Sequence, residues 1–138
     1  MPPPQMTILN APNRDACIAR RERTNTSSQA LLLLNESEYL KAARSLAQKT
    51  LALKGADPGK RLEFAYETVT SKLPDKEETA ILLSLIKSLE ANYSEQPKLA
   101  DELCSGLNLA GAKEKTQLAA WTVLVNALYN LDITKTRE

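Results

Sequence analysis

The chain has 138 residues and a formal net charge of +1, and its composition is 43% hydrophobic but only 4% aromatic. Leu and Ala must therefore supply most of the core, and no overall positive field is present to attract nucleic acid or an anionic membrane. The chain has no histidine, which excludes a Ser-His-Asp triad, a Cys-His pair, a His-ligated zinc and a His-ligated haem. Its longest apolar runs, such as residues 30–34, are far shorter than the ~20 residues that span a bilayer.

Residues 1–25 show no apolar period, and they contain four prolines and the basic run Arg20-Arg21-Glu22-Arg23. We interpret them as an extended Pro/Arg-rich arm that lies over a helical domain formed by residues 26–138. The first residues have neither the basic segment nor the apolar stretch of a signal peptide. Because a proline run is more typical of a linker, we expect the chain to be a fragment of a larger protein.

In the rest of the chain, apolar residues recur three and four positions apart in segments that capping residues and helix breakers separate. Thr26 or Ser27 is predicted to cap a short helix that Asn35 ends. Ser37 is predicted to cap a longer helix that reaches about Leu53. The predicted helices span approximately residues 27–34, 37–53, 58–73, 76–93, 97–107 and 114–131.

Two of these helices have specific start signals. Asp57 is followed by Pro58, which suits a cap and the first helical position. Asp75 is followed three residues later by Glu78, which has the form of a capping box. The helix that follows has the cleanest apolar stripe, with Leu85 in its middle. We therefore predict an all-α fold, a five- to six-helix bundle with an extended N-terminal arm.

The arm and the helix start after it form the first candidate site. Three guanidiniums lie within four residues, and they could clamp carboxylate or phosphate groups beside a helix N-terminus. The alternative is that the arginines pair with acids on the helices and only hold the arm down. A functional arm would more readily contact a protein than nucleic acid, which usually requires more positive charge and interleaved aromatics. The candidate anion or partner contacts are Arg14, Arg20, Arg21, Arg23, Thr24, Asn25, Thr26 and Trp121.

The two cysteines are the second candidate. Cys17 and Cys104 could form a disulfide in an oxidising compartment if the arm lay over the helix that carries Cys104. Because Cys104 lies on an apolar stripe, the favoured interpretation is a small buried residue. Neither cysteine belongs to a CxxC or CxxCH motif, which excludes covalent haem attachment, and we expect no cofactor in this chain.

Polar residues on the helices are the remaining candidates. Asn126 and Asn130 lie four apart on one helix face and are expected to bridge helices by hydrogen bonds. Asp75, Glu77 and Glu78 could perform acid–base chemistry only if their environments differed. They lie in the first turn of a helix, where negative charge is simply stabilising, and we favour that role. The aromatic residues that we interpret as core or boundary positions are Trp121, Tyr39, Tyr66, Tyr93 and Tyr129.

Two stretches near the ends of the chain carry a family resemblance. The first consists of Pro12-Asn13-Arg14, Arg21-Glu22-Arg23-Thr24-Asn25-Thr26, Gln29-Ala30-Leu31 and Leu34-Asn35. The second consists of Ala119-Ala120-Trp121-Thr122, Asn126-Ala127-Leu128, Asn130-Leu131-Asp132 and Thr136-Arg137-Glu138. Between them, Arg61, Tyr66, Leu73-Pro74 and Glu77 fit the same pattern. In this order, they resemble the carboxy-terminal part of the planctomycete family called domain of unknown function 1553.

The resemblance implies little about function. Proteins of that family are large, typically exported, and often carry a cytochrome-c-like domain towards the amino terminus. The resemblance covers only their carboxy-terminal part, and the haem-attachment motif is absent here, so the haem is not carried over. The family has no agreed activity and no agreed catalytic residues.

Three functional hypotheses follow. The first is a non-catalytic structural or interaction module at the C-terminus of a larger, redox-associated exported protein, packed against the upstream domain or another protein. The second is part of a composite enzyme active site, to which the arginines supply an anion clamp. The third and weakest is a nucleic-acid binder. We expect the parent protein to be exported to the periplasm or cell surface, although this chain carries no signal.

Overall fold

The computed structural model of the protein describes residues 4–11, 24–53, 55–107, 109 and 111–135. These residues form helices and connecting turns, with no strand among them. The predicted all-helical bundle is therefore confirmed. Its helices are α1 (Pro4–Ile8), α2 (Ser27–Asn35), α3 (Ser37–Leu51), α4 (Pro58–Thr70), α5 (Lys76–Glu95), α6 (Pro97–Leu103), α7 (Ala112–Tyr129) and α8 (Asp132–Lys135).

The N-terminal segment differs from the extended arm that we predicted. Residues Pro4–Ile8 form the short helix α1, which packs against α2. Proline is compatible with a helix start because the first N–H groups of a helix have no partner within it. Residues 12–23 lie outside the described part of the chain, and the boundary between arm and domain stays a prediction. At the other end, α8 is a short helix beyond the six predicted ones.

The junction of α2 and α3 is tighter than predicted. Asn35 belongs to α2 instead of breaking it, and Glu36 both ends α2 and precedes α3 with an extended backbone. Ser37, the predicted cap, is consequently the first residue of α3, and the side chain of Glu36 makes no capping hydrogen bond. One extended residue thus turns the chain from one helix into the next.

The start signals of α4 and α5 are both confirmed. Asp57 accepts a hydrogen bond from the backbone N–H of Lys60 at 2.8 Å, and Pro58 follows it as the first residue of α4. The capping box of α5 is present in both directions. However, α4 ends at Thr70 rather than at residue 73, because Ser71 adopts a left-handed conformation with φ of 60°.

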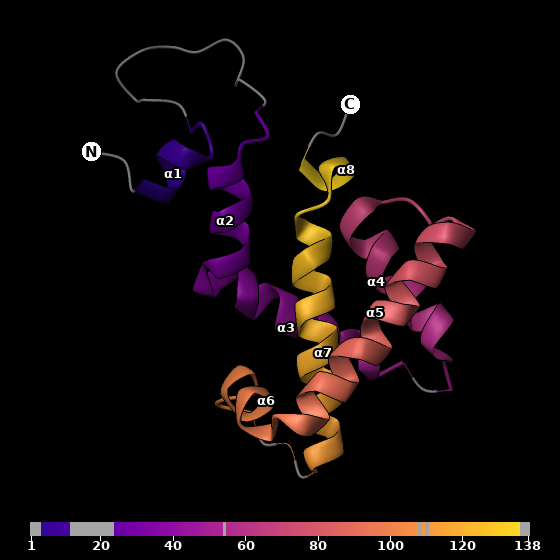
Figure 1. Ribbon diagram of the computed structural model, residues 1–138. Coiled ribbons are helices and arrows are strands. Elements are labelled where there is room, and N and C mark those ends of the chain that lie inside the picture. Colours follow the sequence, from indigo (N-terminus) through magenta and orange to yellow (C-terminus); the bar gives the residue numbers. More distant parts are fainter. Residues whose placement is uncertain (1–3, 12–23, 54, 108, 110, 136–138) are drawn as a thin grey trace.

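The core is organised around α7, which runs through the middle of the bundle (Figure 1). This helix packs against α2, α3, α4, α5 and α6. A helix that is apolar all round requires neighbours on every side, and residues 116–131 contain no charged side chain. Burying each leucine there stabilises the fold by roughly 2 kcal/mol. The largest fully buried apolar side chains are Leu62, Leu118, Leu124, Leu128 and Val125.

Candidate interaction surface

Thr24 and Thr26, which belong to the predicted contact site before α2, make hydrogen bonds within the chain. The Thr26 hydroxyl accepts from the Gln29 backbone N–H at 3.3 Å, and the Thr26 N–H donates to the Gln29 side chain at 3.2 Å. The Thr24 hydroxyl oxygen accepts from Asn10 Nδ2 at 2.5 Å. These contacts cap α2 and hold its entry segment, so they do not by themselves build an anion site. The other predicted contacts in the arm, Arg14, Arg20, Arg21 and Arg23, lie outside the described residues.

Gln29 is a buried polar residue that our sequence reasoning missed. Its Nε2 donates to the carbonyl of Ile8 at 2.9 Å and to the Thr24 hydroxyl at 2.8 Å. Because Gln29 also closes the capping box with Thr26, one side chain fixes α1, the entry segment and the start of α2. The spacing of Thr26 and Gln29 follows the capping-box pattern and could have identified this role.

The two patterned stretches of the sequence contact each other in the structure. Asn25 Nδ2 donates to Asp132 Oδ1 at 2.6 Å, although 107 positions separate them. Asn25 lies just before α2, and Asp132 is the first residue of α8. Trp121, by contrast, was predicted as a surface contact, and it is only 3% exposed. That prediction was wrong, because Trp121 packs into the central core, as its alternative interpretation held.

Asn126 of α7 and Asn130, which follows the last residue of that helix, behave differently from each other. Asn126 is buried, and its Nδ2 donates to the carbonyl of Leu34 at 3.1 Å, which bridges α7 and α2 as predicted. Asn126 Oδ1 and both polar side-chain atoms of Asn130 are buried without a hydrogen-bond partner among the described residues. The predicted bridge is thus confirmed for Asn126 but not for Asn130.

The acidic residues at the start of α5 have a structural role. Asp75 Oδ1 accepts from the Glu78 N–H at 2.7 Å, while Glu78 Oε2 accepts from the Asp75 N–H at 2.9 Å. Glu78 Oε1 accepts a further hydrogen bond, of 2.9 Å, from the Tyr66 hydroxyl. Burial, followed by this hydrogen bond and the nearby carboxylates, raises the pKa of Tyr66 to about 12. Asp75 and Glu78 therefore form the helix cap, and Glu77 lies exposed on the first turn, where negative charge is stabilising.

Cys104 is a buried free thiol. Its Sγ donates to the Lys115 carbonyl at 3.5 Å, and burial raises the pKa of the thiol. A raised pKa disfavours the reactive thiolate, which fits the interpretation as a small buried residue. Its predicted alternative partner, Cys17, lies outside the described residues.

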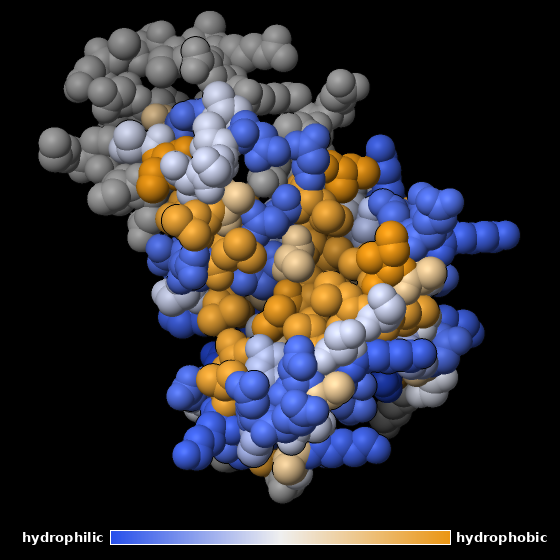
Figure 2. Space-filling model, viewed as in Figure 1, coloured by the Kyte–Doolittle hydropathy of each residue, from blue (hydrophilic) through white to orange (hydrophobic). Residues whose placement is uncertain are grey.

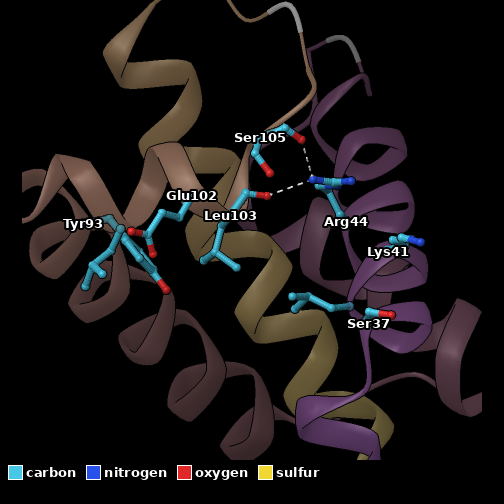
Figure 3. A pocket seen from close by; sticks show the side chains of 9 residues that line it. Ser37, Lys41, Arg44, Tyr93, Glu102, Leu103 and Ser105 are labelled. Carbon is cyan, nitrogen blue, oxygen red and sulfur yellow. Dashed lines mark hydrogen bonds between the residues drawn. The ribbon is translucent and has the colours of Figure 1, made fainter.

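A crevice of about 530 Å3 opens between α3, α6 and the end of α5. Leu40, Leu99 and Tyr93 contribute to its walls. Figure 3 shows Arg44 of α3 directed to the end of α6, where its Nη1 donates to the carbonyls of Leu103 and Ser105 at 3.1 and 3.0 Å. The guanidinium therefore completes the C-terminal end of α6, where backbone carbonyls lack intrahelical partners. We assign Arg44 this structural role.

A second feature is the surface formed where α7 packs against α2 and against α5. Leu34 of α2 is 46% exposed, and Ile81 and Leu85 of α5 are 65% and 36% exposed. Val123 and Ala127 of α7 are partly buried, and α7 packs against both α2 and α5. We refer to these five residues as the apolar face. Figure 2 shows apolar side chains gathered in a band over the region of these helices.

Comparison with known protein families shows which family the chain belongs to. Residues 1–86 match the family described as Protein of unknown function (DUF1553). The chain belongs to this family. The match covers more than half of the chain, and it confirms the predicted family; it includes the first patterned stretch, whereas the second, residues 119–138, lies beyond it. Neither the comparison with curated proteins nor the comparison with solved structures gave a match.

Two further findings concern membrane-spanning helices and metal-binding groups in this DUF1553 chain. In the part of the chain that the structure describes, no helix is both long and apolar enough to cross a membrane. Within the same residues, no three Asp, Glu or Cys side chains are grouped so that they could hold a metal ion.

Proposed function

We propose that this chain is a non-catalytic interaction module at the C-terminus of a larger, redox-associated exported protein. Its role is to pack against the upstream domain of that protein or against another protein. One observation carries the proposal: the apolar face brings leucine and isoleucine side chains of two helices to the surface beside the uncharged part of the central helix, which begins at residue 116. Contiguous exposed apolar surface typically marks a contact site in a soluble domain.

The contacts between the two patterned stretches support the same conclusion. The Asn25–Asp132 and Asn126–Leu34 hydrogen bonds hold α2 against α7 and α8. Leu34 is consequently held in a fixed position beside α7. Preorganised apolar surfaces bind with less loss of conformational entropy than segments that must first become ordered. The described surface is thus suited to binding a partner.

The test is to mix the purified chain with the upstream region of its parent protein and to measure association by calorimetry and by size-exclusion chromatography. We expect a one-to-one complex that Ile81→Lys weakens by about tenfold or more, because the new ammonium would be buried without a partner. Gln48→Lys adds the same charge at an exposed position of α3 and should leave association unchanged. Absence of binding at high micromolar concentration would contradict the proposal, as would equal effects of the two variants.

A further inference from the structure

We propose that the crevice between α3, α6 and the end of α5 binds a small uncharged molecule that has an apolar body and one hydrogen-bond acceptor. The volume of the crevice is about 530 Å3, within the range of about 300–1,000 Å3 that is usual for small-molecule sites. None of the five residues of the apolar face lines it. The inference therefore goes beyond the proposed function and does not depend on it.

The walls of the crevice supply apolar contacts. Leu40 of α3 lines one wall, and Leu99 and Leu103 of α6 line the other together with Tyr93 from the end of α5. Because Leu99 is 46% exposed, a molecule bound against it would remove apolar surface from water. Sites for small ligands typically combine apolar walls with a few polar groups that fix the orientation of the ligand. The body of the ligand is therefore aliphatic or aromatic.

Tyr93 supplies the polar group. Its ring packs against the core, whereas its hydroxyl has no hydrogen-bond partner among the described residues. Figure 3 shows Tyr93 and Glu102 on one side of the crevice, with Ser37 and Lys41 on the other. Burial is the main cause that raises the pKa of Tyr93, so the hydroxyl keeps its proton near neutral pH and can donate it. A ligand oxygen that accepts this hydrogen bond would fix the orientation of the ligand.

The charged side chains of the crevice have partners within the chain or lie at its exposed rim. Arg44 donates to two backbone carbonyls at the end of α6, and Lys41 forms an ion pair with Glu38. Glu102 is exposed, and an exposed ion pair with a ligand cation would contribute little. A charged ligand would lose hydration without gaining a strong counter-charge. The crevice therefore favours an uncharged ligand.

The two walls are held at a fixed separation. Arg44 belongs to α3, and the carbonyls that it binds are those of Leu103 and Ser105 at the end of α6. These hydrogen bonds join the two wall helices directly. A preformed crevice binds a ligand with a smaller loss of conformational entropy than walls that must first come together.

Benzophenone is a suitable probe because it is uncharged and has two apolar rings joined by one carbonyl acceptor. The full chain with isotope-labelled leucine methyl groups is titrated with this probe and followed by NMR. We expect the methyl signals of Leu40, Leu99 and Leu103 to shift, with a dissociation constant below about 1 mM. On ultraviolet irradiation the probe bonds covalently to nearby C–H groups, and mass spectrometry should locate it on residues that line the crevice. Unchanged methyl signals, or labelling confined to other parts of the chain, would overturn the proposal.

A matched pair of changes in protein and probe tests the hydrogen bond. Tyr93→Phe removes only the hydroxyl and should weaken benzophenone binding by about fivefold, as expected for one lost hydrogen bond. Diphenylmethane lacks the carbonyl and should bind the wild-type chain about fivefold more weakly than benzophenone does. It should bind Tyr93→Phe and the wild-type chain equally. Equal affinities of the two chains for benzophenone would show that Tyr93 is not the donor and would overturn the proposal.

Charge changes in the protein and the probe test the location and the selectivity. Leu99→Glu places a carboxylate on the wall and should weaken benzophenone binding by about tenfold. Leu31→Glu adds the same charge at a 63% exposed leucine of α2 outside the crevice, and it should leave the affinity unchanged. Equal effects of the two variants would contradict the location. Tighter binding of para-benzoylbenzoate or para-benzoylbenzylammonium than of benzophenone would show that the crevice recognises charge, and would overturn the assignment of an uncharged ligand.

Discussion

The side chain of Asn126 donates a hydrogen bond to the backbone carbonyl of Leu34, and this 3.1 Å contact joins the central helix α7 to the last turn of α2. The Leu34 carbonyl lies near the C-terminal end of α2, where backbone oxygens lack intrahelical partners. Asn126 therefore satisfies a helix end and at the same time fixes one edge of the apolar face. Its neighbour Asn130, one turn later, makes no comparable bond among the described residues.

This difference predicts opposite contributions of the two asparagines to stability. Asn126→Ala should lower the free energy of unfolding by about 1–3 kcal/mol, because the Leu34 carbonyl would lose its partner. Asn130→Ala should change it by less than about 1 kcal/mol in either direction, since no hydrogen bond is lost and a buried unpaired amide is removed. Urea unfolding followed by circular dichroism measures both values. Similar losses for the two variants would contradict the structure.

The hydrogen bond between Tyr66 and Glu78 predicts a dependence of stability on alkaline pH. The pKa of Tyr66 is raised to about 12 in the folded protein, first by burial and then by the bond to Glu78, whereas an unfolded tyrosine ionises near pH 10. The folded state therefore holds the proton more tightly. The stabilisation from Tyr66 is complete below about pH 10 and is lost between about pH 10 and 12, at no more than about 1.4 kcal/mol per pH unit.

The measurement is the free energy of unfolding between pH 9 and 12, with tyrosinate absorbance of the native protein recorded in parallel. Tyr66→Phe should flatten the pH dependence, and Glu78→Gln should lower the pKa of Tyr66 because it removes the carboxylate charge while keeping an acceptor oxygen. Tyr93 and Tyr129 also have raised pKa values from burial, so some slope should remain in both variants. An unchanged slope in Tyr66→Phe would show that other groups control the alkaline transition.

The helices were largely predictable because their signals are local. The capping residues Asp57 and Asp75 act on the backbone three positions away, so a short window of sequence contains the whole interaction. The end of α4 was predicted too late because proline at position 74 is a weaker constraint than the left-handed backbone of Ser71. Serine adopts that conformation without a distinctive local sequence, so the pattern gave no warning.

The candidate surface was less predictable because it depends on which helices cover each other. Leu85 lies in the cleanest apolar stripe, and periodicity predicts that it is buried, yet it is 36% exposed. Periodicity identifies an apolar side of a helix but not whether a neighbour covers its full width. Trp121 shows the converse error: its place in a family motif suggested a contact residue, whereas the packing of α7 places it in the core. The contacts of Arg44 and the bond from Gln29 to Ile8 were missed because the partners are distant in the sequence, whereas the local capping box of Gln29 with Thr26 could have been found.

Arg44 leads to a final prediction about α6, a helix of only seven residues. Arg44 Nη1 donates to the carbonyls of Leu103 and Ser105, and a cation at the C-terminal end of a helix also interacts favourably with the helix dipole. Arg44→Met retains the apolar part of the side chain but removes these bonds. We expect a loss of about 1–2 kcal/mol, reduced from the fully buried value because Arg44 is partly exposed.

Lys41 provides a matched control for this prediction. It lies on the same helix and lines the same crevice, but its 2.7 Å ion pair with Glu38 is within α3 and exposed. Lys41→Met should therefore change the free energy of unfolding by less than about 0.5 kcal/mol. Hydrogen exchange locates the effect: in Arg44→Met, the amide hydrogens of residues 104–107 should exchange faster, since the end of α6 opens more readily. If both variants are equally stable, or if exchange at the end of α6 is unchanged, the two carbonyl contacts do not hold α6 in place.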